Sequence, residues 1–219
     1  MGNICRNENV DTRVICLKDN PSVLKEILTM DTTFVPTLLN RSLLRLDWRV
    51  RDILLVIGGS LCVAGMAQIR IVLPFTPVPI TGQTFAVLLV GAALGARRGA
   101  ASLLLYLIQG LMGLPFFAGG ASGLAYLLGP TGGYLVGFVA AACLVGLLAA
   151  RGLDRRIPTA LLAFLAGEVV IYLFGVAWLS VFLGIPRAIT AGFLPFLPGD
   201  VIKLIAAGLV LPTAWALVK

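Results

Sequence analysis

The sequence contains no histidine, the side chain that most often relays protons, acts as a catalytic base or binds a metal ion near neutral pH. Its four cysteines show no CxxC spacing, so they indicate neither a zinc site nor a redox motif. We therefore expect no catalytic residues, no metal and no resident cofactor. The protein is predicted not to be an enzyme.

Charge is also scarce. Only 12% of the residues are charged whereas 59% are hydrophobic, a composition far outside the range of soluble domains. The net charge of +7 could suggest nucleic acid as a partner. However, the basic residues lie in short clusters between apolar runs, which is typical of the cytoplasmic loops of membrane proteins. The composition predicts an integral membrane protein whose surroundings are the lipid bilayer, with no role for nucleic acid.

Residues 1–46 lack the apolar core of a signal peptide and contain no long apolar run. We predict a polar N-terminal extension here, cytoplasmic and poorly ordered, followed by a membrane domain at residues 47–219. Two interpretations of the extension stay open. It is either a tail with one short amphipathic helix near residues 23–28, or an untranslated stretch upstream of a true start at Met30.

Six apolar runs follow, and proline, glycine or arginine ends each of the first five. A membrane-spanning helix needs roughly 20 apolar residues, so these runs predict an all-α integral membrane protein with six transmembrane helices. The runs cover residues 53–73, 80–96, 99–113, 132–150, 158–183 and 201–218.

The positive charges predict how these helices are oriented. If the N-terminus is inside, all but three of the 17 basic residues fall on the inner side, and only Arg70, Arg187 and Lys203 fall outside. This asymmetry predicts that both termini are cytoplasmic. It also brings three loops rich in proline, glycine and polar groups, residues 74–83, 114–130 and 186–203, to the outer face, where we expect a ligand to enter.

An acid and a base stand at the start of the last apolar run. Asp200 occupies the expected N-cap position of that helix, and Lys203 follows three residues later on the same helical face. Charges at the border of a membrane helix are costly unless they serve a function. The pair therefore predicts a polar site at the mouth of this helix.

Four motifs occur in a fixed order along the chain. They are PFTPVPITGQT (74–84), LGARRG (94–99), GLPFFAGGASG with YLLGPTGGYLVGF (113–138) and PFLPGDVIK (195–203). In these motifs the chain resembles the biotin-specific S component of energy-coupling factor transporters, the BioY family, from about residue 50 to its end. The resemblance implies high-affinity capture and uptake of biotin across the cytoplasmic membrane. It also implies a transmembrane coupling subunit and two cytosolic ATPases as partners, which alone hydrolyse ATP.

The resemblance assigns biotin binding to Gln83, Asp200 and Lys203, and Gln109 falls where the family often has an amide. We add Tyr172 as a further candidate. Asp200 can accept hydrogen bonds from the ureido N–H groups of biotin, and the two amides can pair with its oxygen or the remaining N–H. Lys203 either meets the carboxylate of biotin or holds Asp200 in its charged form.

Aromatic side chains are expected to form the apolar walls of such a site. The candidates are Phe116, Tyr126 and Trp178. The alternative for each of them is a place in the protein core or against lipid.

Ser60 and Ala64 are small and stand four residues apart on the first predicted helix, so they share one face. Small side chains allow helices to approach closely in lipid. We expect this face to contact the coupling subunit, with internal packing of the bundle as the alternative.

A second class of transporter remains open. Glu168 is an acid inside the fifth apolar run, one helical turn from Tyr172, which suits a stand-alone secondary transporter or facilitator of biotin. A structural hydrogen bond is the alternative role for Glu168. The stretch 129–133 lacks the lysine of a nucleotide-binding loop, so the chain cannot hydrolyse ATP alone.

Overall fold

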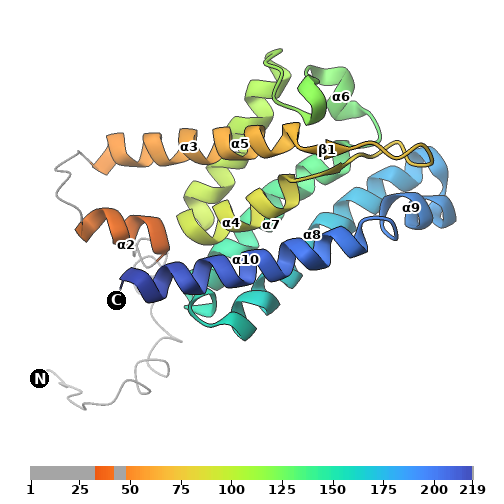
Figure 1. Ribbon diagram of the computed structural model, residues 1–219. Helices are drawn as coiled ribbons and strands as arrows, with labels where there is room; N and C mark the ends of the chain where they lie inside the picture. Colours follow the sequence, from red (N-terminus) through yellow and green to blue (C-terminus); the bar gives the residue numbers. More distant parts are fainter. Residues whose placement is uncertain (1–32, 42–47, 219) are drawn as a thin grey trace, which may run out of the picture. The chain divides into compact units, whose positions relative to one another are not determined.

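The computed structural model describes residues 33–41 and 48–218, and these residues are almost entirely helical (Figure 1). The α-helices are α2 (Phe34–Arg41), α3 (Trp48–Gln68), α4 (Gln83–Leu94), α5 (Ala96–Leu111), α6 (Leu124–Leu128), α7 (Gly132–Ala150), α8 (Ile157–Leu183), α9 (Ile185–Gly192) and α10 (Leu197–Val218). Two short 3-10 helices, η2 (Ala118–Gly120) and η3 (Leu153–Arg155), and two strands, β1 (Arg70–Ile71) and β2 (Ile80–Thr81), complete the described elements.

Four of the described helices, α3, α7, α8 and α10, are long and apolar enough to cross a membrane. The prediction of an all-α multi-pass membrane protein is therefore confirmed. Helices α4 and α5, with 12 and 16 residues, occupy the second and third predicted spans but are shorter than the roughly 20 residues that usually span a bilayer. They are separated by Gly95, whose φ of 84° reverses the chain between them.

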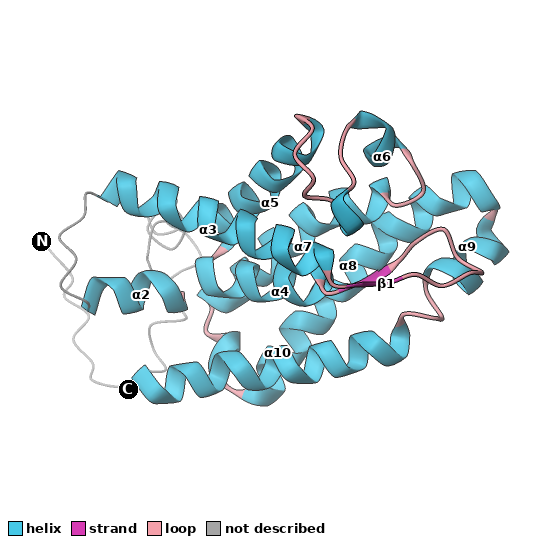
Figure 2. Cartoon of the chain, turned by 45° about the horizontal axis from the view of Figure 1, so that its top comes forward, coloured by secondary structure: helices cyan, strands magenta, loops and turns pink. Residues whose placement is uncertain are grey.

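Helix α7 lies at the centre of this unit and packs against α4, α5 and α8. Small residues bring the backbones close together. A side-chain carbon added to Gly91 of α4 would lie 2.7 Å from the carbonyl oxygen of Ala142 in α7. Figure 2 shows α4 between α3 and α10, and α4 packs against both of these helices. Since lipid provides no hydrophobic force between helices, this close van der Waals packing holds the bundle together.

The first predicted span ends earlier than expected. Helix α3 stops at Gln68, and the chain continues as β1, which pairs antiparallel with β2 and ties Arg70 to Thr81. The last helix begins earlier than expected, at Leu197, so Asp200 lies inside its first turn and the N-cap prediction is wrong. Pro198 is tolerated in a first turn because its missing N–H has no helical partner there.

A buried acid joins η3 to the C-terminal part of α10, on the side away from β1. Asp154 in η3 is only 2% exposed, and it accepts a hydrogen bond of 2.7 Å from the indole Nε1 of Trp215 in α10. Burial raises the pKa of Asp154, an effect that the Trp215 hydrogen bond opposes. The Arg155 guanidinium lies over the Trp215 ring, 5.1 Å from its centre, which fixes the indole between two charged residues.

Helix α2 belongs to this packing, although its residues fall in the predicted polar extension. The Phe34 ring meets Trp215 edge-on at 5.3 Å, and the buried Thr33 side chain lies against Gly95. The predicted boundary at residue 46 is therefore too late, because eight residues are too few to give a clear apolar run. The predictions of a helix near residues 23–28 and of a start at Met30 lie outside the described residues.

Replacing Phe34 by alanine should lower the free energy of unfolding by about 1–2 kcal/mol, because the partly buried ring loses its contact with Trp215. Removing residues 1–29, which contain no apolar run, should leave the melting temperature unchanged. Thermal unfolding of the purified protein in detergent measures both. Equal melting temperatures for the wild type and Phe34→Ala would show that α2 does not stabilise the bundle.

Candidate ligand-binding site

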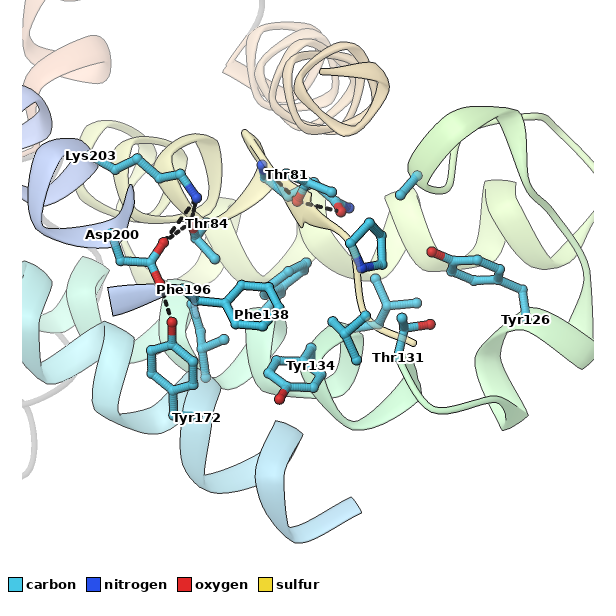
Figure 3. Close-up of a pocket in the computed structure, with 16 residues that line it drawn as sticks. Thr81, Thr84, Tyr126, Thr131, Tyr134, Phe138, Tyr172, Phe196, Asp200 and Lys203 are labelled. Atoms are coloured by element: carbon cyan, nitrogen blue, oxygen red, sulfur yellow. Dashed lines mark hydrogen bonds and ion pairs between the residues drawn. The ribbon is translucent and has the colours of Figure 1, made fainter. Parts of the chain in front are cut away.

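The three predicted loops converge on one cavity, whose empty space of about 490 Å³ is partly open to solvent (Figure 3). Pro79 comes from the first loop, Ala118 from the second and Phe196 from the third. The remaining lining residues are mostly apolar or aromatic, with a few convergent polar groups. They are Val78, Thr81, Gln83, Thr84, Tyr126, Thr131, Tyr134, Leu135, Phe138, Ile171, Tyr172, Asp200 and Lys203.

The charged pair lies at one end of this cavity, and Asp200 is only 3% exposed. Its Oδ1 accepts a hydrogen bond of 2.9 Å from Lys203 Nζ, and its Oδ2 accepts one from the Tyr172 hydroxyl. Lys203 Nζ also donates to Thr84 Oγ1 at 3.1 Å. These contacts, and the N-terminus of α10 around Asp200, stabilise a buried negative charge.

The amide of Gln83 is held in one orientation at the start of α4. Its Nε2 donates to the Tyr106 hydroxyl at 2.7 Å, and its Oε1 accepts from Thr81 Oγ1 at 3.1 Å. An amide has two donors and an oxygen with two acceptor positions. Gln83 therefore keeps one N–H and one acceptor position for a ligand in the cavity.

Aromatic rings form the walls between the charged cluster and the opposite end, where Tyr126 lies (Figure 3). Phe138 and Phe196 line the middle with Tyr134, whose hydroxyl is already used because it donates to the Gly192 carbonyl at 2.7 Å. Tyr126 stacks on Phe117 at 5.1 Å. Burial raises the pKa of Tyr126, so its hydroxyl stays protonated and can donate.

Five of the predicted site residues line this cavity together: Gln83, Tyr126, Tyr172, Asp200 and Lys203. Sequence reasoning missed Thr84, Tyr134, Phe138 and Phe196. Thr84 could have been found, since it directly follows Gln83 in a polar turn. The other three stand in apolar segments that give no sign of which side chain faces a ligand.

Three predicted residues lie elsewhere. Gln109 accepts a hydrogen bond from the Ser60 hydroxyl, so its amide joins α5 to α3. Phe116 packs against the main hydrophobic core, and the half-exposed Trp178 donates its indole N–H to the Gly129 carbonyl at 3.0 Å. None of the three lines the cavity.

The structure also corrects the expected coupling face. Ser60 and Ala64 are 0% and 5% exposed, so they point into the bundle and cannot be reached by another subunit. The alternative of internal packing therefore holds for this pair. The outward side of α3 carries other small residues, Gly58, Cys62 and Gly65, and no atom lies within 4 Å of a side-chain carbon added at either glycine.

Glu168 lies behind the charged cluster, in α8, and is 3% exposed. Neither of its carboxylate oxygens has a hydrogen-bond partner among the described residues, so the expected structural hydrogen bond is not found there. A buried charge without a partner destabilises a protein. Glu168 therefore adds nothing to stability through hydrogen bonding within the described part of the chain.

Replacing Glu168 by glutamine should keep or raise the melting temperature, because the change removes a buried ionisable group but keeps its size. Thermal unfolding in detergent measures this, with Asp200→Asn as the matched control. That control should lower the melting temperature, because Asp200 accepts three hydrogen bonds that its amide cannot all keep. A marked loss of stability in Glu168→Gln would mean that the carboxylate has a partner.

Comparison with known proteins gives one consistent result. The model of the BioY family matches residues 37–219. A probable biotin transporter from Pyrococcus horikoshii is 44% identical over 131 residues, covering 60% of this chain and 76% of the relative. Biotin transporter BioY2 from Lactococcus lactis is 36% identical over 163 residues, covering 72% of this chain and 86% of the relative.

A solved structure is similar as well. The S component for biotin from an ECF-type ABC transporter superposes with a TM-score of 0.68 and is 28% identical in sequence. The match covers 75% of this chain and 90% of that protein. The chain therefore shares its overall fold with that S component.

Proposed function

The chain belongs to the BioY family, and from this premise we propose that it captures biotin at the outer face of the cytoplasmic membrane as the S component of an energy-coupling factor transporter. Like its relatives, which are described as biotin transporters, it is a transport protein and not an enzyme. The observation that carries the proposal is the cavity in which Asp200, Lys203, Thr84 and Tyr172 meet the oriented amide of Gln83.

The polar groups of the cavity match the ureido ring of biotin. The charged Asp200 carboxylate can accept the ureido N–H groups, and the free N–H of Gln83 can donate to the ureido oxygen. Lys203 is bonded to Asp200 and Thr84, which favours the role of holding Asp200 charged. The sulfur-containing bicycle then lies against Tyr134, Phe138 and Phe196.

The cavity requires no resident cofactor for this role, because binding depends on side chains of the chain itself. The positive charges support six membrane passages with both termini in the cytoplasm, with α4 and α5 as two short passages enclosed by longer helices. On this orientation the cavity faces outward. Arg97, Arg98, Arg155 and Arg156 then lie on the cytoplasmic side.

For coupling, we assign the docking surface to the outward side of α3. Gly58, Cys62 and Gly65 form a strip of small residues beside the exposed Leu54 and Leu61, and another helix can approach the backbone closely along this strip. The partner is the transmembrane coupling subunit, whose two cytosolic ATPases hydrolyse the ATP. Glu168, a buried acid near Asp200 and Lys203, favours the second candidate function, a stand-alone transporter driven by an ion gradient.

Asp200→Asn and Lys203→Ala should each weaken biotin binding by about one to two orders of magnitude, because hydrogen bonds to charged groups contribute roughly 1.5–3 kcal/mol. Isothermal titration with purified, folded protein measures the affinity. Trp178→Phe, whose ring lies outside the cavity, is the control and should bind as the wild type does. Unchanged affinity in both charge variants would remove the pair from the binding site.

Gly58→Leu and Gly65→Leu should leave biotin binding intact but abolish ATP-driven biotin uptake in vesicles that contain the coupling subunit and ATPases. Ser60→Leu is the matched control, because this buried position should lose folding and binding together. Normal uptake by the two glycine variants would refute docking on this face. Uptake by the chain alone, dependent on a proton gradient, would support the stand-alone alternative instead.

A further inference from the structure

A second cavity adjoins the biotin cavity. Its empty space of about 700 Å³ is partly open to solvent, and it shares Pro79, Ala118, Tyr126 and Thr131 with its neighbour. These four residues therefore lie at the border between the two spaces. The second cavity also contains a charged residue, Arg70, which the proposed function leaves without a role.

The hairpin fixes Arg70 relative to the biotin cavity. Arg70 in β1 pairs with Thr81 in β2, and the Gly82 N–H donates to the Ile69 carbonyl at 3.0 Å. Gln83 follows directly, so the same short segment carries Arg70 and a cavity amide. The guanidinium lies against the backbone of Gly119, where a side-chain carbon would overlap it, so the glycine makes room for the arginine.

The charge of Arg70 is available to a ligand. Arg70 has no ion-pair partner among residues 33–41 and 48–218, and it is exposed to the second cavity and its opening. Lys203, the other basic residue that lines either space, is bonded to Asp200 and Thr84. An anionic group that reached the joined cavities would therefore meet Arg70 as its free cation.

The shape of the site directs a ligand tail toward this residue. The charged cluster lies at one end of the biotin cavity and Tyr126 at the other (Figure 3). A head group held at Asp200 would extend past Phe138 and Tyr134, and its tail would pass Tyr126 into the second cavity. Biotin has such a form, because a flexible alkyl chain joins its ring system to a carboxylate.

We propose that Arg70 binds the carboxylate of biotin in the second cavity and so selects the free acid over neutral derivatives. This inference rests on the proposed function. The planar guanidinium suits the task, since it can donate two parallel hydrogen bonds to one carboxylate. Asp200 and Gln83 thus bind the ureido ring, and Arg70 binds the carboxylate at the end of the tail.

The test compares biotin with biotinamide, which has the same ring and chain but no charge. Wild-type protein should bind biotin about tenfold more tightly than biotinamide, and Arg70→Gln should lose most of this preference by weakening biotin binding alone. Arg70→Lys should keep part of it. Arg187→Gln removes another exposed positive charge that lines neither cavity, and it should keep the full preference.

Titration calorimetry measures the affinity of each variant for biotin and for biotinamide, each at low and at high salt. A preference in Arg70→Gln equal to that of the wild type overturns the role of Arg70 and leaves the proposed function intact. If the wild type binds neither probe, the proposed function itself fails, and this inference fails with it. An equal loss of both probes in Arg70→Gln, with an unchanged melting temperature, would also overturn it, because the effect would not depend on the carboxylate.

Discussion

The structure around the cavity depends on one constraint: a charge placed between apolar helices must find its partners within the protein. Asp200 meets this constraint through Lys203 from its own helix, Thr84 from α4 and Tyr172 from α8. Three helices are thereby held at one point. The same contacts leave the carboxylate with a fixed position at one end of the cavity.

Close packing of small residues makes this convergence possible. Gly91 in α4 approaches Ala142 in α7 so closely that no side chain fits between them, and Gly137 in α7 lies against Ile171 in α8. Larger residues here would separate α4 from α8, and with them Thr84 from Tyr172. The cavity therefore depends on positions that do not line it, as is common where helices pack closely in lipid.

Polar contacts secure both ends of the bundle, and apolar packing fills the space between. At the end away from the cavity, Asp154 and Arg155 hold the indole of Trp215, and α2 adds Phe34 to the same ring. At the cavity end, the β1–β2 hairpin joins α3 to α4 and carries Arg70. The ligand end thus combines a rigid polar cluster with loops that remain partly exposed.

The amino-acid sequence by itself determined the membrane class, the helices in all six apolar runs and the pairing of Asp200 with Lys203. Each of these follows from composition or from spacing along one helix. Only the tertiary structure decided which face of each helix points inward. Ser60 and Ala64 share a face by their spacing, yet their burial depends on α5 and on Gln109. Likewise, Arg70 lines the second cavity because strand pairing and Gly119 place it there, and the partners that set such contacts are distant in sequence.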